Sequence, residues 1–148
     1  MTHKRQSVVV GVDGSQRSIP VLEWAAQHAR RTGAEVRVVT AWQFPEVVGY
    51  HPPRLEADLS AVVEKIVGEL VDMTLRDVPH EVVIQEGGAA RLLLHEAGNS
   101  DLLVVGIRGR QHDRDHDEVR RLGSVTHSVL VAAPCPVVVV PVDEAAPR

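Results

Sequence analysis

Short apolar runs alternate with segments of helical periodicity along the whole chain, and this alternation constrains the fold most strongly. The clearest runs are 8–12, 102–105 and 137–140, and all three are rich in valine. Between such runs, apolar residues recur every three or four positions, which is the spacing of an amphipathic helix. The alternation predicts an α/β fold with a five-stranded parallel sheet and helices on both faces.

The boundaries of the elements follow from turn and cap signals. In the first helix Pro20 fits the first turn, Gly33 follows the last turn, and either Ser15 or Ser18 is the expected N-cap. Residues 43–54 and 143–148 are expected to lie outside regular structure. The predicted strands are 8–12, 35–42, 81–85, 102–105 and 137–140, and the predicted helices run near 19–31, 55–75, 89–97 and 122–130.

Composition narrows the class of protein. The chain has 148 residues, which fits one domain over 1–148, and aromatic residues make up only 3%, so the core must be aliphatic. A net charge of −4 argues against a dedicated nucleic-acid-binding protein. The lone Cys135 fits a reducing compartment, and neither a long apolar span nor a signal peptide is evident. We therefore expect a cytoplasmic protein with no membrane partner.

Two strand ends carry residues typical of a binding site. Asp13-Gly14-Ser15 follows the first strand, and two glycines, Gly106 and Gly109, follow the fourth. Gly123-Ser124 then opens the last helix. Glycines and a helix N-terminus present backbone N–H groups to phosphate, while a carboxylate can bind ribose hydroxyls. If the first and fourth strands are neighbours, these features form a nucleotide site; the alternative for 13–15 is a simple turn before a helix cap.

The chain resembles the universal stress protein family. The resemblance rests on four segments in the family's order, 9–15, 101–109, 122–125 and 135–140, which span almost the full length. It implies a five-stranded sheet of order 3-2-1-4-5, a Rossmann-like adenine-nucleotide-binding fold, and a homodimer. The edge strand Val137 to Val140 would pair with the same strand of a second copy; the alternative is that a terminal segment covers this edge.

The resemblance also implies a ligand, because one branch of the family binds ATP, with or without Mg²⁺. Asp13 would contact the ribose or adenine side, and the backbone of Gly11 and Ala41 would lie near the base. Arg108 also falls within the predicted site. The phosphates would be held by Gly106, Gly109, Gly123, Ser124 and Val125.

The loop between the two glycine motifs departs from the family's pattern. The ATP-binding pattern has nine residues between Gly-x-x-Gly and Gly-Ser, whereas thirteen residues, 110–122, stand here. This loop holds four acidic residues and four arginines. The leading hypothesis is a homodimeric, ATP-binding stress-response regulator. The alternative is a module that binds no nucleotide and docks a protein partner, of unknown identity, through the charged loop.

Other functional patterns are weaker. His112 and His116, with the aspartates around them, resemble metal ligands, but a solvated charged loop is the favoured interpretation, and no metal is predicted. No nucleophile, general base or complete P-loop is evident, so we expect no enzyme, although slow ATP hydrolysis is compatible with the site. An ATP-dependent ligase is disfavoured because a second substrate domain is missing.

Overall fold

The computed structural model describes residues 5–43, 53–107 and 122–142, with side chains of the second range from residue 59. Its sheet is parallel throughout and has the order β3-β2-β1-β4-β5, which confirms the predicted α/β fold. The strands are β1 (Ser7–Gly11), β2 (Glu35–Trp42), β3 (His80–Glu86), β4 (Leu102–Gly106) and β5 (Val137–Val140). The helices are α1 (Ser18–Thr32), α2 (Pro53–Thr74), α3 (Ala89–Glu96) and α4 (Ser124–Ala132), with a 3-10 turn at Ala97–Asn99.

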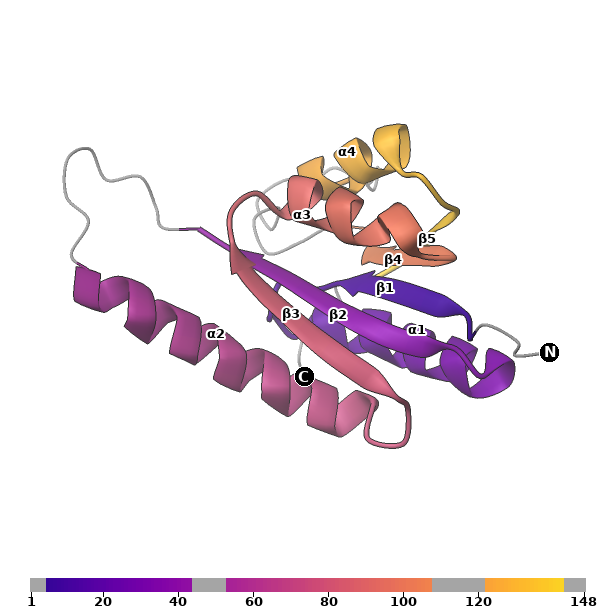
Figure 1. The fold of residues 1–148 in the computed structure, drawn as a ribbon, viewed down its shortest axis with the longest axis horizontal. Helices are drawn as coiled ribbons and strands as arrows, with labels where there is room; N and C mark the ends of the chain where they lie inside the picture. The colour runs from indigo at the N-terminus through magenta and orange to yellow at the C-terminus, as the bar shows by residue number, and fades with distance from the viewer. Residues whose placement is uncertain (1–4, 44–52, 108–121, 143–148) are drawn as a thin grey trace.

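Helices cover both faces of the sheet (Figure 1). The pair α1 and α2 packs on one face, and the pair α3 and α4 packs on the other. Successive side chains of a strand point to opposite faces, so each central strand serves both cores. In β1, Val8 and Val10 face α1 and α2, whereas Val9 faces α3 and α4. The continuous valine runs are therefore explained by burial on both sides.

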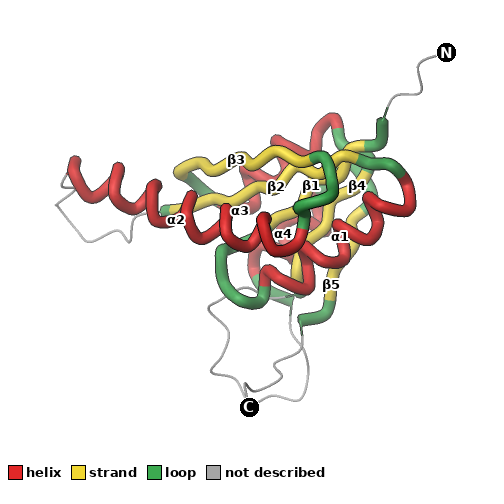
Figure 2. Tube along the Cα trace, turned by 90° about the horizontal axis from the view of Figure 1, so that it is seen from below, coloured by secondary structure: helices red, strands yellow, loops and turns green. Residues whose placement is uncertain are grey.

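The two edges of the sheet are formed by β3 and by the shorter strand β5 (Figure 2). On its inner side β5 pairs with β4, where the amides of Leu103 and Ile107 donate to the carbonyls of Pro136 and Val140, each at 3.0 Å. Because strand hydrogen bonds alternate with a period of two residues, the backbone groups of Val137 and Val139 point away from β4. These groups form an edge that is unpaired within the described residues.

The ends of the helices differ from the sequence expectation in two places. Helix α2 begins at Pro53 rather than Leu55, because proline is compatible with a first helical turn. Helix α4 begins at Ser124 with Gly123 as its N-cap, which confirms that Gly123-Ser124 opens the last helix. Neither Ser15 nor Ser18 caps α1: Arg17 occupies the N-cap position without a side-chain cap. The expected C-cap is confirmed, since Gly33 has φ 75° and its N–H donates to the carbonyl of Ala29 at 2.8 Å.

Several predictions fall on residues outside the described ranges. They concern residues 44–52 and 143–148 and nearly all of the charged loop 110–122, including the pattern around His112 and His116. Within the described ranges, no helix combines the length and the hydropathy that crossing a bilayer requires.

Candidate functional site

A cavity of about 500 Å³ lies at the C-terminal ends of β1, β2 and β4. Strands β1 and β4 are neighbours, as the nucleotide-site prediction required, with Val10 paired to Val104. Strands β2 and β3 lie on one side of β1, and strands β4 and β5 lie on the other. The order of strands therefore reverses between β1 and β4, and in open parallel sheets ligands bind outside such a reversal.

The structure brings the predicted site residues together wherever it describes them. Seven of the nine line this cavity, although they come from four separate parts of the chain. The remaining two, Arg108 and Gly109, lie outside the described residues. The seven are Gly11, Asp13, Ala41, Gly106, Gly123, Ser124 and Val125.

The carboxylate of Asp13 is held in a fixed orientation at the end of β1. Its Oδ1 accepts hydrogen bonds from the Ser15 amide at 2.9 Å, from Ser15 Oγ at 2.6 Å and from Ser18 Oγ at 3.1 Å. Both serines thus bond to Asp13 instead of capping α1, which explains the failed cap prediction. A carboxylate oriented in this way accepts hydrogen bonds from ligand hydroxyls with little loss of its own conformational freedom.

Gly14 makes this turn possible, because its φ of +82° lies in the left-handed region. We expect Gly14→Ala to lower the free energy of unfolding by about 1–2 kcal/mol, since alanine is strained there. The new Cβ would also lie 3.4 Å from Cγ2 of Ile66. Chemical denaturation measures the effect.

Gly68→Ala in α2 is the matched control, because nothing lies within 4 Å of its added Cβ. That variant should be at least as stable as the wild type, since alanine favours a helix. Equal stability of the two alanine variants would contradict a strained turn at Gly14.

The start of α4 presents to the same cavity backbone donors that have no partner within the helix. Gly123 is the N-cap and provides no side-chain cap, so the first-turn amides at Ser124 and Val125 lack an intrahelical partner. The helix is fixed against β4, since Thr126 Oγ1 donates to the Gly106 carbonyl at 2.7 Å and the Gly123 amide donates to the Ile107 carbonyl at 2.9 Å. The positive end of the helix dipole adds to the attraction for an anion.

Sequence reasoning missed several residues of the cavity. Asp13 and Arg17 are the charged groups of its described lining, so it contains one positive and one negative side chain. Leu59 and Val63 of α2 and Leu93 of α3 add apolar surface. Their contribution depends on how the helices pack across the strand ends, and no local sequence pattern predicts that packing. Arg17 was detectable in principle, because it directly follows the Asp13 turn.

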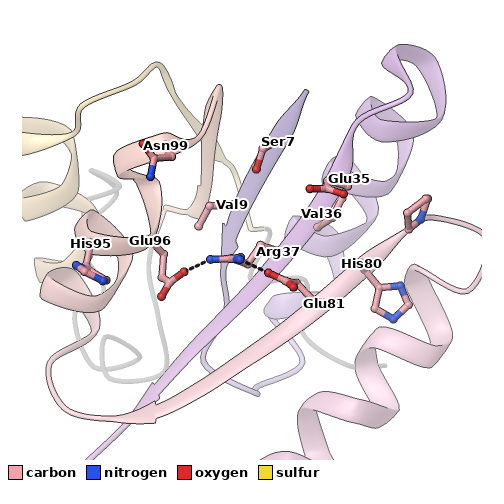
Figure 3. Close-up of a pocket in the computed structure, with 11 residues that line it drawn as sticks. Ser7, Val9, Glu35, Val36, Arg37, His80, Glu81, His95, Glu96 and Asn99 are labelled. Atoms are coloured by element: carbon pink, nitrogen blue, oxygen red, sulfur yellow. Dashed lines mark hydrogen bonds and ion pairs between the residues drawn. The ribbon is translucent and has the colours of Figure 1, made fainter. Parts of the chain in front are cut away.

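A second cavity, of about 460 Å³, lies at the opposite end of the sheet, where β2 and β3 begin (Figure 3). Its centre is occupied by Arg37, whose guanidinium pairs with Glu81 and, at 2.5 Å, with Glu96. Hydrogen bonding to Glu96, and secondarily to Glu81, raises the pKa of Arg37. The cation is thus already neutralised by protein carboxylates, and we interpret this cluster as a structural tie between β2, β3 and α3.

Removal of Arg37 is expected to destabilise the protein, because the carboxylate of Glu96 would lose the cation with which it pairs. The Glu96 side chain is only 11% exposed. We expect Arg37→Met to cost about 1–2 kcal/mol of unfolding free energy, less than for a fully buried pair because Arg37 itself is partly exposed. The double variant Arg37→Met/Glu96→Gln should recover part of this loss in a denaturation series. Strictly additive losses would show that the two side chains are not coupled.

Comparison with known proteins places the chain in a family. The model of the universal stress protein family matches residues 4–141. Among curated proteins, universal stress protein Rv2005c of Mycobacterium tuberculosis is 35% identical over 137 residues, which is 89% of this chain and 44% of the relative. Rv2028c of the same species is 30% identical over 94% of this chain and 49% of its own length. The chain thus spans about half the length of the curated relatives it matches.

Two solved structures share the fold over nearly their whole length. The protein MJ0577 superposes with a TM-score of 0.78 at 21% identity, covering 95% of this chain and 98% of the other. A universal stress protein solved in complex with cAMP superposes with a TM-score of 0.65 at 25% identity, covering 94% and 98%. The structures thus share the fold, and the match of the family model to residues 4–141 shows that the chain belongs to the universal stress protein family.

Proposed function

We propose that this protein is a cytoplasmic stress-response protein that binds ATP in the cavity at the ends of β1 and β4, and that it acts as a homodimeric, nucleotide-dependent regulator. One observation carries the nucleotide proposal. An oriented carboxylate and an uncapped helix N-terminus face the same cavity, so groups suited to ribose and to phosphate are combined in one site.

In this proposal the phosphates, the ribose and the base of the nucleotide lie at three different parts of the cavity. Phosphates would lie at the start of α4, where amides and the helix dipole attract negative charge. The ribose would lie at β1, where Asp13 accepts hydrogen bonds from its hydroxyls. The base would then lie towards Ala41 and Trp42 at the end of β2. Arg17 adds a positive charge to the lining and partly offsets the charge of Asp13.

Two further observations support this assignment. A cavity of about 500 Å³ is within the size range of small-ligand sites. The related protein with cAMP shows that a member of the same fold carries a nucleotide. Both observations favour a nucleotide as the ligand, and the choice of ATP rests on the family's glycine motifs.

We propose no efficient catalysis at this site. The described lining of the cavity contains no histidine, cysteine or lysine, and Asp13 is its one carboxylate. Its Oδ1 is already engaged by two serines. Slow hydrolysis of bound ATP is compatible with this lining. A turnover of about 1 per second, which is within the range of ordinary enzymes, would contradict the proposal.

Equilibrium dialysis with labelled ATP tests the proposal directly. Saturable binding below millimolar ATP is expected, and parallel cells with Mg²⁺ and with a chelator show whether the metal contributes. Protein that binds no ATP at millimolar concentration under either condition would reject the nucleotide function.

The lengthened loop 110–122 motivates the second candidate, a module that docks a protein partner without nucleotide. A variant with this loop shortened to nine residues separates the two functions. If the natural loop only bulges outwards, shortening it changes the entropic cost of loop closure little. The ATP affinity of the variant should then stay within about threefold of the wild type. A large gain in ATP affinity would show that the natural loop obstructs the phosphate site, which would favour the docking module.

A further inference from the structure

Thr40 is the exception among the buried polar residues of the described structure. The other three, Ser18, Thr74 and Thr126, each donate a hydrogen bond, to Asp13, to the Leu70 carbonyl and to the Gly106 carbonyl respectively. Thr40 is 2% exposed, and its Oγ1 has no hydrogen-bond partner in the described residues. It also lines the cavity at the strand ends.

The neighbours of Thr40 make this hydroxyl costly for the fold. Val36 and Val38 precede it on the same face of β2, and both are buried valines. Valine has nearly the shape of threonine and would fill this position without burying an unpaired polar atom. A buried polar group without a partner calls for an explanation. Because Thr40 belongs to the cavity wall, a hydrogen bond to a ligand in the cavity is a physical explanation.

The position of Thr40 indicates which part of a ligand it meets. Strand β1 pairs with β2 as far as Gly11 and Val39. One residue further along both strands, Thr40 lies beside Val12, the residue before Asp13. Strand β2 lies two strands away from β4, which is about 10 Å at the usual strand spacing. A phosphate at the start of α4 and a ribose at Asp13 therefore leave the base for the end of β2.

We propose that the Thr40 hydroxyl hydrogen-bonds the heterocyclic base of the bound nucleotide and makes the cavity selective for a ligand with a polar base. The proposal rests on nucleotide binding at this site. A hydroxyl can donate to a ring nitrogen or accept from an exocyclic amine. Rotation about χ1 exchanges the positions of Oγ1 and the methyl group among staggered rotamers, so the hydroxyl can turn towards the base when a ligand binds.

Calorimetric titration of the wild type, Thr40→Val and Thr40→Ser with ATP and with inorganic tripolyphosphate tests this role. We expect Thr40→Val to weaken ATP binding about tenfold, as the loss of a hydrogen bond to a buried partner predicts, and to leave tripolyphosphate binding unchanged. Thr40→Ser keeps the hydroxyl and should bind ATP within about threefold of the wild type. The melting temperature of the ligand-free Thr40→Val protein should equal or exceed that of the wild type.

The outcomes separate this inference from the proposed function. Equal ATP affinity of the wild type and Thr40→Val would overturn the role of Thr40 and leave nucleotide binding intact; an ordered water would then satisfy the hydroxyl. Equal losses for ATP and tripolyphosphate would also overturn it, because the effect would not lie at the base. A wild type that binds no ATP would reject both proposals together.

Discussion

Replacement of Asp13 by alanine is expected to weaken ATP binding about 10- to 100-fold, the effect of losing hydrogen bonds to a charged group. Asp13 lines the cavity and follows directly after β1, the central strand of the sheet. Its orientation is set by three hydrogen bonds from Ser15 and Ser18, so little rearrangement is needed for it to accept ribose hydroxyls. Isothermal titration with ATP measures the change.

Two controls isolate the contribution of Asp13 to binding. Asp72→Ala removes the same charge from an exposed position on α2, outside the cavity lining, and should leave the affinity unchanged. Chemical denaturation shows how much Asp13→Ala loosens the turn itself. A folded Asp13→Ala protein that binds ATP as tightly as the Asp72→Ala control would contradict the assignment of the ribose to β1.

Replacement of Val139 by proline is expected to convert the proposed homodimer into monomers. The Val139 amide points away from β4, so proline removes a donor from the outer edge and leaves the pairing of β5 with β4 in place. Pairing with a second copy through this edge would lose that hydrogen bond and meet the proline ring. Analytical ultracentrifugation at micromolar protein measures the shift.

Val138→Pro is the matched comparison, because the backbone of Val138 faces β4. It should lower the stability of the fold itself, which Val139→Pro should largely preserve. A Val139→Pro protein that remains dimeric would show that the copies associate through another surface. A wild type that is monomeric would reject the homodimer altogether.

The central sheet was predictable because its residues are buried on both faces. Continuous aliphatic runs such as the valines 8–10 and the leucine-valine run 102–105 admit few other structures, and they form β1 and β4. The alternation of strands and helices does not determine the order of strands, however. That order came from the family resemblance, and the observed order β3-β2-β1-β4-β5 confirms it.

Local patterns failed where side chains had a choice of partner. Ser15 and Ser18 both suit an N-cap, but the Asp13 carboxylate offers a stronger acceptor, and the structure shows both serines bonded to it. The contact between Arg37 and Glu96 joins residues 59 positions apart and could not be inferred from spacing. Thr40 reads as an ordinary strand residue, since threonine favours strands, and only its burial without a partner makes it exceptional.

The most direct test of nucleotide binding is a crystal structure of the protein soaked with ATP, with ligand-free crystals as the reference. We predict density for phosphates at the first turn of α4, for ribose beside Asp13 and for the base near Thr40 and Ala41. An empty cavity at saturating ATP, or nucleotide bound only at another surface, would contradict the assignment of this site.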